Sequence, residues 1–181
     1  PSTGKRIAVV GGGPGGLSAA YYLQLMGHQT TVFEMLPKLG GMLRYGIPNY
    51  RLPKDRLDED IQAILETGVQ VEFGKRIGKD ITSLRQEYDA VLISIGASTD
   101  KKLGIEGEHA EGVISAVSFL RDVGENKSPD LTGQEVAVIG GGNVSMDAVR
   151  TAKRLGAKKV SIVYRRRTAD MTALPAEIEG A

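Results

Sequence analysis

The sequence of 181 residues predicts an α/β fold with parallel sheets, divided into two similar units of which the second is incomplete. Two observations carry this prediction. A short apolar run leads into a cluster of glycines and then a helical pattern, once near the N-terminus and again from residue 135. Elsewhere short apolar runs alternate with helical patterns, which is typical of a parallel α/β sheet. We expect the boundary between the units at residues 104 and 105.

The first unit alternates β-branched runs with helical spacing of apolar residues. The expected strands are 6–10, 30–34, 69–73 and 89–95, and the expected helices are 17–26, 54–67 and 81–88. Asp80 is a candidate cap for the last of these helices. The run DAVLISI at 89–95 is apolar almost throughout, which predicts a strand buried on both faces. The stretch 39–53 is punctuated by glycine and proline, so no regular element is expected there.

The second unit repeats the opening pattern after a polar, glycine-rich junction at 104–112. Its glycine cluster is Gly140, Gly141 and Gly142, directly after an apolar run. The expected strands are 135–139 and 159–164, the expected helices are 115–123 and 144–155, and a further helix begins within 173–179. A strand, a glycine turn, a helix and a strand form a βαβ unit, so the chain holds two copies of one such unit.

Composition excludes several classes of protein. Glycine makes up 24 of 181 residues, about 13%, where roughly 7% is usual, and no G-X-Y repeat explains the excess. The absence of cysteine excludes a disulfide framework, a cysteine-ligated metal cluster and a redox-active thiol pair within these residues, and fits a cytoplasmic location. The 23 basic and 22 acidic residues are too balanced for a nucleic-acid partner. No apolar run has the length of a membrane span.

The first glycine cluster matches the pattern G-x-G-x-x-G at Gly11, Gly13 and Gly16. The first glycine permits a tight turn, the second lets the backbone approach a pyrophosphate, and the third lets the helix pack close to the strand. The pyrophosphate then lies at the positive end of the helix. Glu34 ends the next strand, where a carboxylate binds ribose hydroxyls and repels a 2′-phosphate. These Rossmann-like features favour FAD or NAD over NADP.

The second glycine cluster has Ser145 where the third glycine would stand, and its following strand ends differently. Tyr164 is followed there by Arg165, Arg166 and Arg167 instead of a carboxylate. A guanidinium binds phosphate in a bidentate manner, so this end favours the 2′-phosphate of NADP. Arg165 and Arg166 are the preferred candidates. A solvated basic turn without a ligand is the alternative interpretation.

Longer motifs resemble one protein family. The segment GGMLRYGIPNYRLP at 40–53 looks like the signature of the glutamate synthase small-subunit family, which includes the flavin half of dihydropyrimidine dehydrogenase and related NADPH–ferredoxin oxidoreductases. The segments GGGNVSMD at 140–147 and YRR at 164–166 resemble its NADPH site, and 89–97 resembles the strand and glycine turn where its two domains meet. This similarity covers residues 5–181.

The resemblance implies a flavoprotein oxidoreductase that transfers a hydride from NADPH to FAD and passes electrons to an iron–sulfur domain or subunit. It implies an N-terminal part of an FAD domain over 1–104 and a partial NADPH domain over 105–181. The family also implies a set of cofactor-binding positions. No side chain is an obvious acid–base catalyst, and without cysteine no iron–sulfur ligand is expected in these residues. The expected FAD positions are Gly11, Gly12, Gly13, Pro14, Gly15, Gly16, Glu34, Met35, Leu39, Gly40, Gly41, Met42, Arg51, Ile77 and Gly96, and the expected NADPH positions are Gly141, Gly142, Asn143, Val144, Arg165 and Arg166.

Other interpretations remain. In this family a returning segment completes the flavin site, so we expect the sequence to be a fragment that binds FAD weakly or not at all by itself. A catalytically silent dinucleotide-binding fragment is one alternative. A flavin monooxygenase also has two glycine motifs, although the segment at 40–53 argues against it. A disulfide reductase of the thioredoxin reductase type would need a cysteine pair, which these residues lack.

Overall fold

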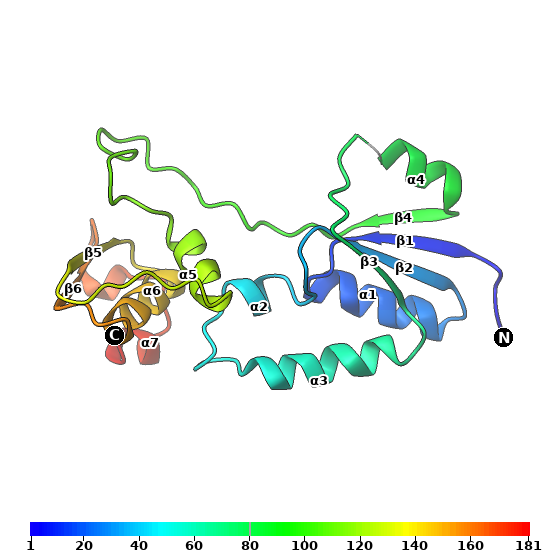
Figure 1. The fold of residues 1–181 in the computed structure, drawn as a ribbon, viewed down its shortest axis with the longest axis horizontal. Coiled ribbons are helices and arrows are strands. Elements are labelled where there is room, and N and C mark those ends of the chain that lie inside the picture. Colours follow the sequence, from blue (N-terminus) through cyan, green and yellow to red (C-terminus); the bar gives the residue numbers. More distant parts are fainter. Residues whose placement is uncertain (80) are drawn as a thin grey trace. The chain divides into compact units, whose positions relative to one another are not determined.

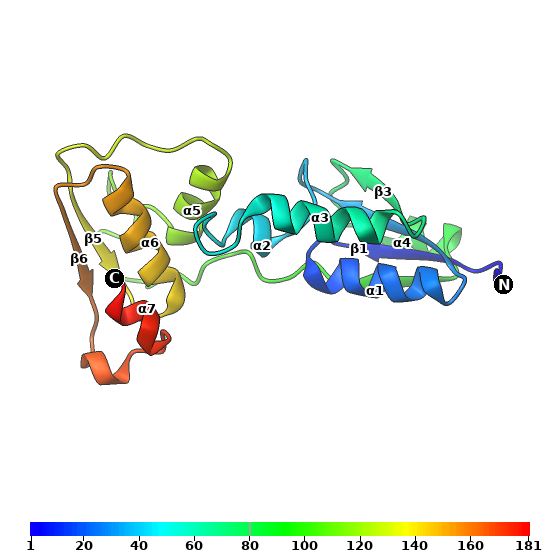
Figure 2. The same cartoon turned by 90° about the horizontal axis from the view of Figure 1, so that it is seen from below.

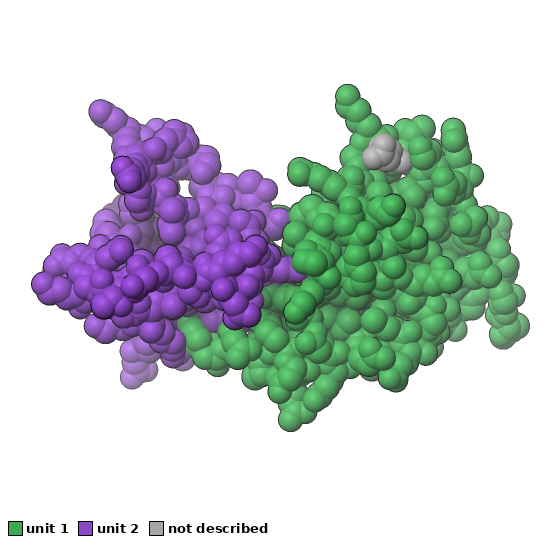
Figure 3. All heavy atoms as spheres, in the orientation of Figure 1, with its two compact units in different colours: residues 1–44, 49–97 green, residues 45–48, 98–181 purple. Residues whose placement is uncertain are grey.

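The computed structural model of the protein describes residues 1–79 and 81–181 and divides into two compact units. Unit 1 comprises residues 1–44 and 49–97, and unit 2 comprises residues 45–48 and 98–181 (Figure 3). The two units are described separately below. The domain boundary expected at residues 104 and 105 stays a prediction.

Unit 1 is built on a four-stranded parallel sheet in the order β3-β2-β1-β4. The strands are β1 (Arg6–Val10), β2 (Gln29–Glu34), β3 (Gln70–Phe73) and β4 (Ala90–Ile93). Val10 is paired with Phe33 on one side and with Ile93 on the other, and Glu34 is paired with Phe73. The carboxyl ends of the strands therefore meet at one edge of the sheet, where the first glycine cluster follows β1.

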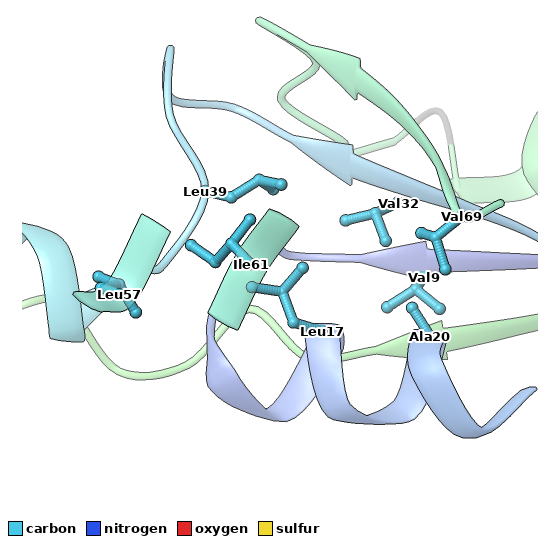
Figure 4. Close-up of a cluster of buried hydrophobic side chains, with 8 residues drawn as sticks. All are labelled: Val9, Leu17, Ala20, Val32, Leu39, Leu57, Ile61 and Val69. Carbon is cyan, nitrogen blue, oxygen red and sulfur yellow. The ribbon is translucent and has the colours of Figure 1, made fainter. Parts of the chain in front are cut away.

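Helices cover both faces of this sheet (Figures 1 and 2). The helices α1 (Pro14–Leu25) and α3 (Lys54–Leu65) lie on one face, and α4 (Ile81–Glu87) lies on the other. Figure 4 shows the larger core, between the sheet and the helices α1 and α3. Its buried members are Val9, Leu17, Ala20, Val32, Leu39, Leu57, Ile61 and Val69. On the opposite face Phe33 and Leu84 pack with Ala8 and Val10.

The elements of unit 1 agree with the sequence patterns to within two residues at their ends, apart from three features. Helix α1 begins at Pro14, earlier than expected, because a proline fits the first position of a helix, where no N–H partner is needed. A short helix, α2 (Met42–Tyr45), lies in the stretch expected to be irregular. The full burial expected for 89–95 is wrong, since β4 is an edge strand and Ile93 and Ile95 are 57% and 68% exposed. The predicted cap Asp80 lies outside the described residues.

Unit 2 contains one pair of parallel strands, β5 (Glu135–Ile139) and β6 (Lys159–Val163). The helices α5 (Ala116–Gly124) and α6 (Asn143–Arg154) pack against them through a small core of Phe119, Leu120, Ala148 and Ala152. A 3-10 turn (Thr168–Asp170) and α7 (Pro175–Glu179) follow β6. The α/β class with parallel sheets is thus confirmed. No helix in the described part of the chain is long and apolar enough to cross a membrane.

Candidate functional site: two glycine turns

The first glycine turn is shaped by very close backbone contacts. Gly11 has φ +110°, and a Cβ there would lie 2.3 Å from the Ser94 carbonyl oxygen. A Cβ on Gly16 would lie 1.9 Å from the Gly11 carbonyl oxygen. The Gly11 N–H donates to the Phe33 carbonyl at 2.9 Å, which ties the turn to the end of β2. Only glycine fits at these two positions, because the neighbouring atoms belong to the backbone and cannot rotate away.

The turn leads directly into the amino end of α1. Gly13 is the N-cap residue and Pro14 follows in the first helical turn. The Leu17 N–H donates to the Gly13 carbonyl at 2.9 Å, so Gly15 and Gly16 precede the first intrahelical bond. Backbone N–H groups at this end of a helix, together with the helix dipole, favour a phosphate group. The geometry therefore fits a pyrophosphate.

Glu34 is fixed beside this turn at the end of β2. The residue is 6% exposed, and its carboxylate accepts hydrogen bonds from the Gly12 N–H at 2.8 Å and the Leu36 N–H at 2.7 Å. A Cβ on Gly12 would lie 2.9 Å from Glu34 Oε2 and 2.4 Å from Leu39 Cδ2. Each carboxylate oxygen keeps a further lone pair, which can accept from a ribose hydroxyl. The carboxylate thus stands where the motif requires it.

A second turn, at Leu39, Gly40 and Gly41, lies against the first. The Gly40 N–H donates to the Gly12 carbonyl at 2.8 Å, and a Cβ on Gly41 would lie 2.7 Å from the Gly13 Cα. This contact brings the first part of the segment at 40–53 onto the glycine turn. The other FAD candidates are less closely placed: Met35 is 49% exposed, Met42 and Arg51 are half-buried, Ile77 packs beside Phe33 and Leu84, and a Cβ on Gly96 would meet no atom within 4 Å.

Two residues of this site were missed by the sequence reasoning. Ser94 lines the turn with its backbone oxygen beside Gly11 and its Oγ 2.9 Å from a Cβ placed on Gly15. The only available signal was a lone hydroxyl within an otherwise apolar run. Arg44 is buried behind the Gly40 turn and pairs with Asp58. Burial and the nearby Arg44 guanidinium lower the pKa of the Lys54 ammonium, which donates to the Leu43 carbonyl at 2.8 Å.

The second glycine turn, in unit 2, has the same plan. Gly140 has φ +139°, and a Cβ there would lie 2.5 Å from Ser145 Oγ, so the serine hydroxyl occupies the space beside it. The Gly140 N–H donates to the Val163 carbonyl at 3.0 Å, which is the counterpart of the bond from Gly11. Ser145 is 8% exposed, so a small residue here still permits close packing. Val144 is 44% exposed at the start of α6.

The segment after β6 folds back onto this turn. The Ala173 N–H donates to the Gly141 carbonyl at 3.0 Å, and the Leu174 N–H donates to Asn143 Oδ1 at 2.9 Å. A Cβ on Gly141 would lie 2.8 Å from the Tyr164 ring and 3.0 Å from Met171 Cγ. The Asn143 side chain and the Tyr164 ring therefore hold the turn in shape.

The three arginines after β6 are all exposed but differ in their contacts. Arg167 is paired with Asp170, with Nε 3.1 Å from Oδ2 and Nη2 3.3 Å from Oδ1. Tyr164 donates its hydroxyl to the Asp170 carbonyl at 2.9 Å. Within the described residues Arg165 and Arg166 make no such ion pair, and their role in binding a phosphate stays a prediction. Across the described chain no three His, Asp or Glu side chains gather in a way that could hold a metal ion.

Comparison with known proteins identifies the family. Residues 5–181 match the model of the pyridine nucleotide-disulphide oxidoreductases. The chain belongs to this family. Because it contains no cysteine, a disulfide cannot form among its own residues.

Curated relatives are longer proteins. The chain is 46% identical over 184 residues to the NADP(+)-dependent formate dehydrogenase subunit beta of Moorella thermoacetica, covering 99% of this chain and 26% of that protein. It is 34% identical over 191 residues to the glutamate synthase [NADPH] small chain of Escherichia coli, covering 99% of this chain and 40% of that protein. The resemblance to the glutamate synthase small-subunit family is confirmed. The chain spans well under half the length of these relatives.

A solved structure has the same fold. Mycobacterium tuberculosis FprA in complex with NADPH superposes with a TM-score of 0.81 at 27% identity, and the match covers 96% of this chain and 46% of FprA. The Rossmann-type α/β architecture is therefore shared with an oxidoreductase that binds NADPH.

Proposed function

We propose that this chain provides the FAD-binding turn and the NADPH-binding turn of a flavoprotein oxidoreductase. One observation carries the proposal: two glycine turns of the same geometry are followed by opposite charges at the end of the second strand of each βαβ unit. The buried Glu34 lies beside the first turn. The exposed Arg165 and Arg166 follow β6, which pairs with β5, the strand that leads into the second turn. Each charge suits a different adenosine ribose.

The first turn fits FAD. The positive end of α1 would hold the FAD pyrophosphate, with Gly15 and Gly16 before the first intrahelical bond. The Glu34 carboxylate, held by two backbone N–H groups, is oriented to accept from the ribose 2′- and 3′-hydroxyls and would repel a 2′-phosphate. Leu39, Gly40 and Gly41 close one side of this cradle.

The second turn fits NADPH. The Gly140 turn and the amino end of α6 repeat the pyrophosphate geometry of unit 1. Arg165 and Arg166 are the cations for the 2′-phosphate, since Arg167 is already engaged by Asp170. Several relatives carry NADP or NADPH in their names, which supports the same choice of coenzyme.

When bound, NADPH supplies a hydride and FAD accepts it and releases electrons one at a time. The residues of this chain bind and orient the two groups, and no side chain among those described is needed as an acid or base. An iron–sulfur domain or subunit is the proposed electron acceptor, in keeping with relatives that are themselves named as subunits. A cytoplasmic location is proposed with it.

The test is a titration of the full-length protein with NADPH and, separately, with NADH. Binding of each coenzyme is followed by difference absorbance spectroscopy. We expect Arg165→Ala and Arg166→Ala each to weaken NADPH binding about tenfold, or about 1.4 kcal/mol, and to leave NADH binding unchanged. Lys159→Ala is the matched control, because Lys159 is an exposed cation at the opposite end of β6. Equal affinity of the unmutated protein for both coenzymes would contradict the NADPH assignment.

A further inference from the structure

The Leu39–Gly41 turn forms one wall of the proposed FAD cradle, so its position matters for binding. Gly40 bonds to the Gly12 carbonyl, and Gly41 lies so close to Gly13 that a Cβ on it would be 2.7 Å from the Gly13 Cα. The turn has left-handed backbone at both glycines, with φ +117° at Gly40 and +51° at Gly41. The Leu39 side chain packs in the core, but the two glycines have no side chains, so the backbone of the turn depends on contacts from other residues.

Arg44 occupies the position behind this turn. Its side chain is 10% exposed, and its Nε donates to the Leu39 carbonyl. A Cβ on Gly40 would lie 3.2 Å from the Arg44 Cβ and 3.5 Å from its Nε, so the arginine stem packs directly under the glycine. The Arg44 side chain thus contacts the backbone of the turn at both Leu39 and Gly40.

The other end of the guanidinium is anchored to α3. Arg44 Nη2 pairs with Asp58 Oδ1, and Asp58 lies on the same helix as Leu57 and Ile61, which are buried against the sheet. Lys54, at the start of α3, donates to the Leu43 carbonyl at 2.8 Å. Two cations therefore tie the segment 39–44 to a helix that is itself fixed in the core.

We propose that Arg44 is a positioning residue for the FAD-binding turn, with Asp58 as its anchor. Arg44 contacts the turn at the Leu39 carbonyl and at Gly40, and it acts by holding the Leu39–Gly41 turn against Gly12 and Gly13. A buried guanidinium needs its partners to offset the loss of hydration, and an apolar side chain could fill the same space without that cost. We therefore infer that a charged residue is needed here for the two contacts that hold the turn in place.

The inference rests on the proposed function, and the variants separate the two. In the full-length protein freed of flavin, Arg44→Met keeps the volume and removes both contacts. We expect it to weaken FAD binding about tenfold, with unchanged NADPH affinity and cooperative unfolding of the apoprotein. Arg44→Lys keeps a charge that can reach one partner but not both. It is expected to restore part of the affinity, and Asp58→Asn to weaken it about threefold.

A double variant and a matched control complete the design. Arg44→Met combined with Asp58→Asn is expected to bind FAD no more weakly than Arg44→Met alone, because both remove one interaction. Arg56→Met is the control: Arg56 is an exposed arginine on α3, 71% exposed in its side chain, and it pairs with Glu59. Arg56→Met is expected to leave both the FAD affinity and the visible circular dichroism of the bound flavin unchanged. Arg44→Met should alter that circular dichroism.

The outcomes are distinct. Failure of the unmutated protein to bind FAD would overturn the proposed function and this inference with it. Normal FAD affinity in Arg44→Met, when the unmutated protein binds FAD, would overturn the inference alone. An equal fall in FAD and NADPH affinity would assign Arg44 to general folding and would also overturn it. If Arg44→Met does not fold, Arg44→Lys and Asp58→Asn decide the matter, and unchanged FAD affinity in both would count against a positioning role.

Discussion

Neighbouring glycines in α1 should respond in opposite ways to the same substitution. A Cβ on Gly16 would lie 1.9 Å from the Gly11 carbonyl oxygen, whereas a Cβ on Gly15 would meet only Ser94 Oγ at 2.9 Å. The serine hydroxyl can rotate away, but the backbone oxygen cannot move without shifting the turn. Alanine at either position also favours the helix by roughly 0.5–1 kcal/mol through reduced backbone entropy.

The magnitude follows from these opposing effects. Overpacking costs about 1–3 kcal/mol, and a contact with backbone at this distance belongs at the upper end. We therefore expect Gly16→Ala to be less stable than Gly15→Ala by about 2 kcal/mol, which corresponds to a difference of roughly 10 °C in Tm for a unit of this size. Gly15→Ala should be as stable as the unmutated protein or slightly more stable.

The assay is urea and thermal unfolding of the flavin-free full-length protein, followed by circular dichroism. Gly16→Ala should also bind FAD at least tenfold more weakly, because displacing Gly11 changes the cradle for the pyrophosphate. Equal stability of the two variants would refute the reasoning, since it would mean that the Gly11–Gly16 contact is not as close as the structure has it.

Three further predictions follow from single contacts. Glu34→Gln should lower the free energy of unfolding by about 2 kcal/mol in urea titrations. The carboxylate accepts two backbone hydrogen bonds, whereas the amide would turn its NH2 group toward one of these N–H donors. The matched control is Glu72→Gln, at an exposed glutamate. The hydrogen bond from Lys5 lowers the pKa of the Asp89 carboxyl, so the contribution of Asp89 is present near neutral pH and is lost as the pH falls through its depressed folded-state value. When Tm is measured from about pH 6 down to pH 2, it should therefore fall less steeply for Asp89→Asn than for the unmutated protein. Tyr164→Phe loses the bond to the Asp170 carbonyl and should cost about 1 kcal/mol of stability, with weaker NADPH binding in a coenzyme titration; an unchanged NADPH affinity would show that the hydroxyl does not support the second turn.

The agreement between sequence and structure is closest where the signal is local. Strands β1 and β5 have the bounds that their apolar runs predicted, and α5 begins after Ser115, whose Oγ accepts from the Ser118 N–H at 3.3 Å. These features depend on side-chain periodicity and on capping over a few residues, so they can be read along the chain.

The disagreements arise where a pattern has more than one tertiary outcome. The run at 89–95 is apolar on both faces, but its burial depends on how many strands lie beside it. In the described residues β4 pairs with β1 alone and its far edge stays open, so Ile93 is 57% exposed. The periodicity of one strand carries no information about its neighbours.

By itself the sequence determined the order of elements, both glycine turns and the opposite charges of Glu34 and Arg165, because each depends on residues close together along the chain. Tertiary structure alone decided that Ser94 lines the first turn and that Arg44 pairs with Asp58 behind it. These contacts join residues that the strand order and the packing of α3 bring together. Their energies depend on distances that no local pattern of side chains specifies.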